Sequence, residues 1–195
     1  KASILTYVIY LIARPVTQLY STPEKSPITS WAYSILGQIY VVLPLALLGV
    51  WGYKSDYQLF MNTEYLLMAL FVFVWTNDTG AYIVGCTLGK HRLFERISPK
   101  KSWEGFFGGL AFCIILASLA NYIIPGMLST AQWIGMGILT SIFSTWGDLC
   151  ESLLKRTAGV KDSGKILPGH GGILDRFDSE LIASPVIFIY LTFVL

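Results

Sequence analysis

Charged side chains and glycines are concentrated between residues 159 and 178, in the stretch GVKDSGKILPGHGGILDRFD. Gly171 and the glycines beside it permit backbone conformations that other residues avoid, and their N–H groups can form a concave anion site. Asp175 and Asp178 add carboxylates to a segment with several basic side chains: Lys161, Lys165, His170 and Arg176. A magnesium–nucleotide complex needs both charges, because carboxylates bind the ion while lysines and arginines bind phosphate oxygens. This composition therefore indicates binding of such a complex.

Three further acids lie where the chain is otherwise apolar. Asp148 and Glu151 follow a long uncharged run, and Asp78 lies inside the apolar segment FVFVWTNDTGAYIVG. An ionisable group at membrane depth is costly and is usually retained for a function. Glu151 also has a structural interpretation, because Lys155 follows it at the i,i+4 spacing of a helical ion pair. Asp78 and Asp148 are therefore the stronger functional candidates.

A second polar segment, GKHRLFERISPKKSWEGFFGG at 89–109, has the same mixture of basic and acidic residues. Ser98 and the proline after it are typical of a turn, Lys101 supplies positive charge, and Glu104 begins the next apolar run. Two such segments on one face of a helical bundle can enclose one anionic substrate. Basic residues beside membrane segments also mark topology or contact anionic headgroups, and an acid at a helix start is favourable by itself. Both interpretations stay open for this segment.

The elements that position these residues are expected to be membrane helices. Of the 195 residues, 54% are hydrophobic and only 13% are charged, and the mean hydropathy is +0.59. A soluble domain is about one quarter charged, and in water this chain would leave too much apolar surface uncovered. Backbone polar groups in lipid must be satisfied within the segment, so helices are the expected spanning element. We predict an all-α, polytopic integral membrane helix bundle that forms a single domain over residues 1–195.

Five to six apolar runs approach the roughly 20 residues that a membrane-spanning helix requires. They are Trp31–Tyr53, Tyr65–Leu88, the two parts of Gly105–Gly147 on either side of Pro125, Leu181–Leu195 and the shorter Ile4–Ala13. The connections at 89–104 and 148–180 each hold five lysines and arginines, whereas the connection PGMLSTAQ holds none. Because basic connections face the cytoplasm, both rich connections are expected on that side, with the site between them.

The segment SLLKRTAGVKDSGKILPGHGGILDRFD resembles the signature of the phosphatidate cytidylyltransferases, which are also called CDP-diacylglycerol synthases. SPKKSWEGFFGG and NDTGAY are similar to two further blocks of that family, and all three blocks occur in the family's order. The resemblance covers residues 75–180, just over half of the chain. It implies an integral membrane enzyme that joins CTP to phosphatidate, releases pyrophosphate and requires Mg²⁺, alone or with a second cation.

The resemblance also implies roles for residues at matching positions. Asp148 and Asp175 would bind the metal and, with Lys161 and Arg176, would form the catalytic set. The implied substrate-binding positions are Ser98, Lys101, Lys155, Arg156, His170, Gly171 and Asp178, and Asp78, Glu104 and Glu151 are additional family positions. The attacking phosphatidate oxygen is already an anion at neutral pH. The reaction therefore needs positioning and charge neutralisation rather than a strong general base.

Two other functions account for part of the pattern. A CTP-dependent lipid-alcohol kinase, of the dolichol or phytol type, would use similar acids and basic groups but would transfer the γ-phosphate to an alcohol. The complete segment PGHGGILDRFD favours the cytidylyltransferase over this kinase. An ion-coupled transporter would explain Asp78 and Asp148 as an ion path, but it would not explain the glycine-rich basic segments.

CTP, phosphatidate and the lipid bilayer are the expected partners, and no nucleic acid is expected. A homodimer is compatible with so small a bundle, although no motif indicates one. The expected location is the bacterial inner (cytoplasmic) membrane, with the active site facing the cytoplasm. Family members are usually longer at the N-terminus, so the chain is expected to be an N-terminally truncated fragment.

Overall fold

The computed structural model describes residues 2–20, 26–52, 63–166 and 171–195, which form two compact units, Lys1–Leu43 and Pro44–Leu195. The first unit contains α1 (Ala2–Leu19), α2 (Pro27–Gly37) and the π-helical turn η1 (Gln38–Val42). Within it, the Arg14 guanidinium of α1 donates hydrogen bonds to the hydroxyl oxygens of Ser30 and Ser34 on α2. The Arg14 guanidinium of the apolar helix α1 thus has hydrogen-bond partners on α2. The prediction of a single domain stays untested by this division.

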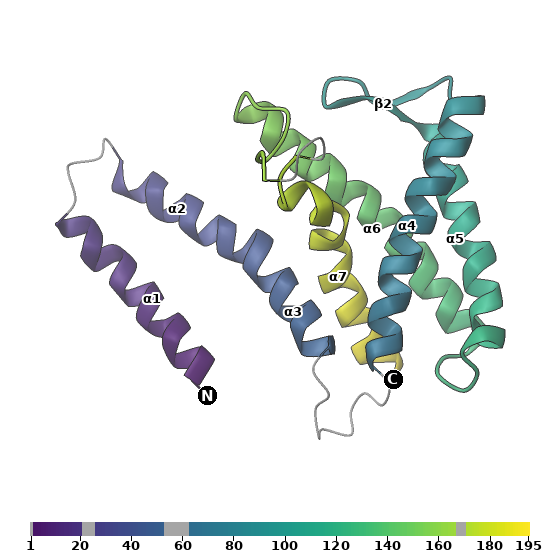
Figure 1. The fold of residues 1–195 in the computed structure, drawn as a ribbon, viewed down its shortest axis with the longest axis horizontal. Coiled ribbons are helices and arrows are strands. Elements are labelled where there is room, and N and C mark those ends of the chain that lie inside the picture. Colours follow the sequence, from purple (N-terminus) through teal and green to yellow (C-terminus); the bar gives the residue numbers. More distant parts are fainter. Residues whose placement is uncertain (1, 21–25, 53–62, 167–170) are drawn as a thin grey trace. The chain divides into compact units, whose positions relative to one another are not determined.

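The second unit holds the remaining elements: α3 (Leu43–Gly52), α4 (Thr63–Leu88), β1 (Arg92–Phe94), β2 (Ser98–Ser102), α5 (Trp103–Ile123), α6 (Thr130–Thr157) and α7 (Leu174–Val194). Helix α4 packs on α5, α5 on α6, and α6 on α7, and α4 also contacts both α6 and α7 (Figure 1). The buried apolar side chains between these helices include Leu66, Leu70, Phe73, Cys113, Ala117, Trp133, Met136, Ile187 and Leu191. This packing confirms the predicted all-α bundle.

The ends of the helices lie where the local sequence dictates. Ser102 caps α5, because its Oγ accepts a hydrogen bond from the Gly105 N–H at 3.1 Å. Helix α5 ends before Pro125, and Gly126 adopts a positive φ of 81° that favours glycine. Helix α6 then begins at a capping box formed by Ser129 and Gln132.

Four helical segments in the described part of the chain are long and apolar enough to cross a membrane: Pro27–Val50, Glu64–Leu88, Trp103–Ile123 and Leu174–Val194. The other two segments predicted to contribute to spans are also helical, as α1 and α6. Helix α6 has 28 residues, but it places hydroxyl side chains such as Thr140, Ser141 and Ser144 in the interior, so its apolarity is lower. The chain is an integral membrane protein. Helix α6, the most polar of its long helices, packs against α4, α5 and α7.

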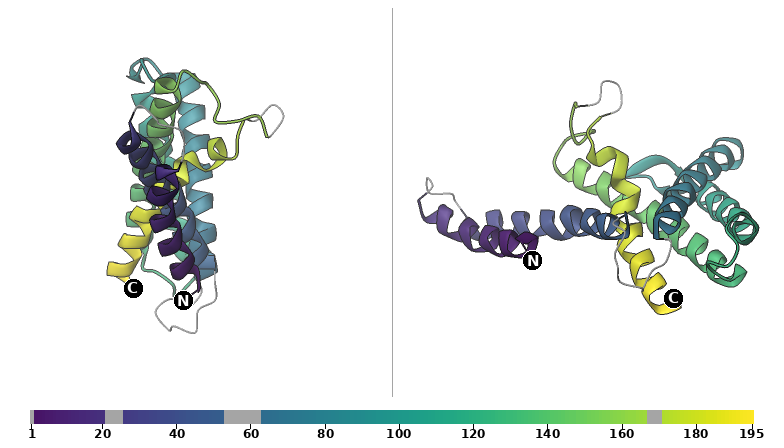
Figure 2. Two further views of the ribbon diagram at one scale, coloured as in Figure 1. Left: turned by 90° about the vertical axis from the view of Figure 1, so that its left-hand side faces the viewer. Right: turned by 60° about the horizontal axis from the view of Figure 1, so that its bottom comes forward.

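The two basic connections lie at the same end of the α4–α7 bundle, and the uncharged α5–α6 connection lies at the opposite end (Figures 1 and 2). This arrangement agrees with the alternation predicted from the charges. One of the two connections differs in conformation from the expected loop. Arg92–Phe94 and Ser98–Ser102 form an antiparallel hairpin, and Ser98 pairs with Phe94 instead of starting a turn. The turn starts three positions earlier and occupies residues 95–97, because the chain must reverse before β2 returns to α5.

Candidate functional site

A cavity of about 830 Å³ lies between α4, α6 and the start of α7. One wall is apolar and comes mainly from α4, through Met68, Phe71, Val72, Val74 and Trp75. The polar side chains around it are Asp78, Asp148, Asp175, Arg176, Asp178, Ser179 and Glu180. Residues separated by about one hundred positions in the sequence therefore form one amphipathic cavity, with acids at one part and an apolar wall at another.

A smaller cavity of about 270 Å³ adjoins the first, because Asp78 and Asp148 line both. Its other walls come from the hairpin and the start of α5, and they add Lys100, Lys101 and Ser102. The large cavity is thus rich in carboxylates, whereas the small one places two lysines beside the shared acids. Together the two cavities offer both charges that a metal–nucleotide complex requires.

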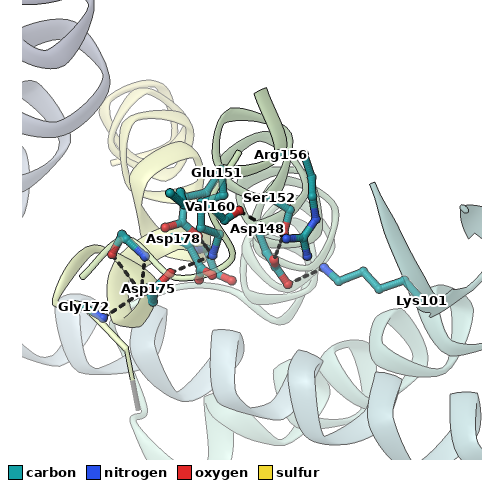
Figure 3. A network of polar contacts seen from close by, with 12 residues as sticks. Lys101, Asp148, Glu151, Ser152, Arg156, Val160, Gly172, Asp175 and Asp178 are labelled. Atoms are coloured by element: carbon teal, nitrogen blue, oxygen red, sulfur yellow. Dashed lines mark hydrogen bonds and ion pairs between the residues drawn. The ribbon is translucent and has the colours of Figure 1, made fainter. Parts of the chain in front are cut away.

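Asp148 lies near the C-terminal end of α6 and contacts the hairpin. Lys101 Nζ, from β2, lies 2.6 Å from Asp148 Oδ2, and the Ser152 hydroxyl donates to Oδ1 at 3.2 Å. The Asp148 side chain keeps 31% of its surface exposed, and the Lys101 side chain keeps 26%. Figure 3 shows Lys101 reaching Asp148 from the side opposite to α7. The carboxylate therefore stays accessible to a ligand.

Asp175, in the first turn of α7, is held much more firmly. Its Oδ1 accepts a hydrogen bond from Lys155 Nζ at 2.7 Å (Figure 3). Its Oδ2 accepts three more, from the Ser163 N–H at 2.9 Å, the Ser163 hydroxyl at 2.8 Å and the Gly172 N–H at 2.7 Å. The side chain is only 7% exposed. Asp175 thus links the end of α6, the connection after it and the start of α7.

Lys155 joins two carboxylates. Besides Asp175, its Nζ contacts Glu151 Oε2 at 2.7 Å, which is the i,i+4 pair predicted from the sequence. Glu151 is 1% exposed, and its other oxygen, Oε1, is buried without a hydrogen-bond partner among the described residues. Because a buried carboxyl group is costly without a partner, the contacts of Lys155 offset the burial of both Glu151 and Asp175.

A neutral polar network lies one turn deeper between α4 and α6. Asn77 Nδ2 donates to Ser144 Oγ and Thr145 Oγ1 at 3.2 Å each, and the Ser141 hydroxyl donates to Asn77 Oδ1 at 2.6 Å. Helix α5 approaches this network closely at Gly109, where a Cβ atom would lie 2.5 Å from Asn77 Oδ1. The network therefore needs glycine on α5, and it fixes the rotation of α4 relative to α6, which positions Asp78 and Asp148.

The structure gathers most of the predicted site residues. Asp78, Lys101, Asp148, Asp175, Arg176 and Asp178 line one or both cavities, and Lys155 and Glu151 join them through Asp175. Gly171 has a φ of 82°, and a Cβ atom there would lie 2.6 Å from Asp175 Oδ2, so glycine is required beside this carboxylate. His170 lies outside the described residues.

Four predicted residues neither line the two cavities nor belong to the network around Asp175. Ser98 is partly buried in β2, and Lys161 is exposed in the connection after α6. The exposed Arg156 donates a hydrogen bond from Nη1 to the Val160 carbonyl oxygen at 3.3 Å. Glu104 holds the start of the hairpin segment. Its carboxylate accepts a hydrogen bond from the His91 N–H, and its Oε1 lies 2.6 Å from His91 Nδ1. The structural interpretation of Glu104 thus accounts for its contacts.

Several residues of the site were not selected from the sequence. Asn77 has a visible signal, since an amide directly before Asp78 interrupts an apolar run. Glu180 also lines the large cavity, and it is buried on α7 two residues after Asp178. Ser163, which binds Asp175, has no signal in the sequence, because its role depends on how the connection folds back. The N–H groups of Gly171 and the glycines beside it were predicted to bind an anion, and the Gly172 N–H binds the Asp175 carboxylate.

The donor set fits Mg²⁺ that is completed by substrate oxygens. Mg²⁺ is usually bound by one or two carboxylates together with water and phosphates. In the part of the chain that the structure describes, no group of three or more His, Cys, Asp or Glu side chains could hold a metal ion. Asp148 and Asp175 nevertheless line one cavity. Lys101 Nζ lies 2.6 Å from the Asp148 carboxylate, and Lys155 Nζ lies 2.7 Å from the Asp175 carboxylate. Each carboxylate therefore already accommodates a cation.

Comparison with known proteins agrees with this geometry. The model of a family described as the cytidylyltransferase family matches residues 1–194. A phosphatidate cytidylyltransferase of Staphylococcus aureus (strain COL) is 41% identical over 160 residues, which are 82% of this chain and 61% of the relative. Proteins of the same name from Staphylococcus haemolyticus (41% over 159 residues) and Staphylococcus epidermidis (40% over 159 residues) match with the same coverage. The chain thus spans about three fifths of the length of the curated relatives it matches.

Proposed function

This chain belongs to the cytidylyltransferase family, and we propose that it acts as a phosphatidate cytidylyltransferase. In this reaction a phosphate oxygen of phosphatidate forms a bond to the α-phosphorus of CTP. The bond between the α-phosphorus and the bridging oxygen breaks, and pyrophosphate leaves with that oxygen. The products are CDP-diacylglycerol and pyrophosphate.

The observation that carries the proposal is the amphipathic large cavity. Its wall on α4 is apolar and belongs to a membrane-spanning helix, whereas Asp175, Arg176 and Asp178 come from the start of α7, directly after a polar connection. A lipid phosphate and a water-soluble nucleotide meet only at such a boundary. A site for a soluble substrate alone would not need the apolar wall, and a lipid site alone would not need the acids.

Mg²⁺ is the proposed cofactor, and Asp148 and Asp175 would hold it, with Asp78 and Asp178 in the same cavity. When bound, the ion would neutralise phosphate charge and draw electron density from the α-phosphorus. Lys101 and Arg176 line the two cavities, so both are available for phosphate oxygens, whereas Lys155 supports Asp175 from behind. These cations offset the repulsion between two polyanions, which is the main obstacle to the transfer.

Ser98, Arg156, Lys161 and His170 are proposed to hold the nucleotide phosphates from the surrounding segments. Arg156 and Lys161 are exposed at the bundle end that contains the cavities, so their side chains are free of burial constraints. The basic connections at this end also support an inner-membrane location with the site on the cytoplasmic side. A homodimer stays a prediction, to be tested by the mass of the protein in detergent.

The test is to incubate the purified protein in detergent with phosphatidate, CTP labelled in the cytosine ring and Mg²⁺. We expect the label in a lipid product, and pyrophosphate released in equal amount. A lipid-alcohol kinase would leave the label in water-soluble CDP. Labelled CDP without labelled lipid would therefore replace the proposed function with that alternative.

A further inference from the structure

A third cavity, of about 170 Å³, lies between α4, the end of α5 and the start of α6. It is lined almost entirely by apolar side chains: Tyr65, Met68, Ala69, Val72, Phe73, Leu116, Ala120, Ile123, Ile124 and Trp133. Met68 and Val72 also line the large cavity that contains the acids. The two cavities therefore adjoin along α4, and the third cavity extends the apolar wall away from the polar site.

The third cavity lies about as far from the acids as the end of an acyl chain would reach. Met68 and Val72 precede Asp78 on the uninterrupted helix α4, so they lie about 15 Å and about 9 Å from it along the axis. The hydrocarbon chains of one leaflet occupy about half of a core that is about 30 Å thick. A chain that begins beside the acids would thus end near Met68 and Ala69, inside the third cavity.

We propose that the third cavity holds the terminal part of one fatty-acyl chain of the lipid substrate and that its width sets the chain length which the protein accepts. This inference rests on the proposed function. The occupant is an acyl chain because the cavity is apolar, belongs to membrane-spanning helices and continues the cavity in which the lipid phosphate is proposed to bind. Ala69 and Ala120 are the smallest side chains of the lining, so they leave the space that the chain end fills.

The test is Ala69→Phe, because Ala69 is only partly buried and a larger side chain there would fill the cavity without entering the core. We compare kcat/KM for dioctanoyl and distearoyl phosphatidate in mixed micelles. The ratio of long-chain to short-chain kcat/KM should fall about tenfold, since about two methylene groups would lose their burial. Leu116→Ala should shift the preference toward longer chains, because it widens the same cavity.

The matched control is Ala111→Phe, which makes the same change at an exposed position of α5 that lines none of the three cavities. This variant should keep the chain-length ratio of the unmodified protein. An unchanged ratio in both Ala69→Phe and Leu116→Ala, or an equal loss for all chain lengths, would overturn the inference. Formation of no CDP-lipid from any phosphatidate by the unmodified protein would instead contradict the proposed function.

A binding measurement that needs no turnover further separates a failure of this inference from a failure of the proposed function. Phosphatidate with a diazirine at the end of one acyl chain is photocrosslinked to the unmodified protein, and the labelled peptide is identified by mass spectrometry. Labelling within 65–73 or 116–124, or of Trp133, is expected, and Ala69→Phe should reduce it. Labelling elsewhere would overturn the inference.

Discussion

Two polar regions of the bundle lie next to each other on the same pair of helices, and they differ in how completely their groups are satisfied. In the deeper region, Asn77 exchanges hydrogen bonds with Ser141, Ser144 and Thr145, and all four side chains are neutral and buried. In the region above it, Asp78 and Asp148 face two cavities, and Asp148 keeps about a third of its surface exposed. Asn77 and Thr145 also line the small cavity, but their side-chain polar groups are paired within the network, whereas the Asp148 carboxylate is partly exposed to a ligand.

A polar residue in an apolar helix is therefore not by itself a sign of chemistry. Asn77 and Asp78 both line the small cavity, but Asn77 is hydrogen-bonded to hydroxyl side chains of α6, whereas Asp78 also lines the large cavity. The neutral Asn77 amide donates and accepts hydrogen bonds with side chains of α6, so it stabilises the packing of α4 on α6. The carboxylates carry charge that only a cation can balance, so they are available for binding.

The largest effect is expected from Asp148→Asn. The variant keeps the shape and the Ser152 contact but loses the charge that would bind the metal. CDP-diacylglycerol formation should fall about a thousandfold, equivalent to about 4 kcal/mol in the barrier, with an unchanged melting temperature. The measurement is initial rate at saturating CTP and Mg²⁺, and turnover close to that of the unmodified protein would remove Asp148 from the reaction.

The next largest effect is expected from Lys155→Met, which removes the cation between Glu151 and Asp175. Two buried carboxylates would lose their partner, so the free energy of unfolding should fall by about 3 kcal/mol. Thermal unfolding in detergent measures the loss. Adding Glu151→Gln to this variant should restore part of the stability, and Lys165→Met, at an exposed position, is the control. If Lys155→Met is as stable as the unmodified protein, the contacts of Lys155 with Glu151 and Asp175 do not hold α6 and α7 together.

A smaller effect on stability is expected from Asn77→Leu, which has a similar volume but no hydrogen-bonding groups. The Ser141 hydroxyl would lose its acceptor, and the free energy of unfolding should fall by about 1–2 kcal/mol. Activity per folded molecule should change much less than in Asp148→Asn. The control is Thr79→Val on the exposed side of the same helix, where the lost hydrogen bond is to Trp75 of α4 itself. Loss of activity without loss of stability would place Asn77 in the site.

The smallest effect is expected from Lys161→Gln. Its exposed side chain would lose only a screened attraction for a phosphate, so KM for CTP or phosphatidate should rise a few-fold, and kcat should change little. Steady-state kinetics at two salt concentrations measure this change, which should shrink at the higher one. An unchanged KM for both substrates at low salt would exclude Lys161 from the phosphate site.

The sequence was sufficient to predict the helices and the end of the bundle that holds the site, since apolar runs, Pro125 and the basic connections report on single segments. It also identified Asp148, Asp175 and the Glu151–Lys155 pair. It did not distinguish the open Asp148 from the enclosed Asp175, because the partners of Asp175 come from Ser163 and the Gly172 N–H in a connection without regular structure. The hairpin was missed because its three-residue strand is shorter than any periodic pattern.

Asp148 and Asp175 are proposed to bind a divalent cation that is also coordinated by the phosphates of CTP. Electron paramagnetic resonance of Mn²⁺, used in place of Mg²⁺, measures this binding directly in the presence of CTP. Mn²⁺ bound in the presence of CTP should be detected in the unmodified protein and in folded Asn77→Leu, and it should be lost in Asp148→Asn. Equal Mn²⁺ affinity in Asp148→Asn and the unmodified protein would contradict the account.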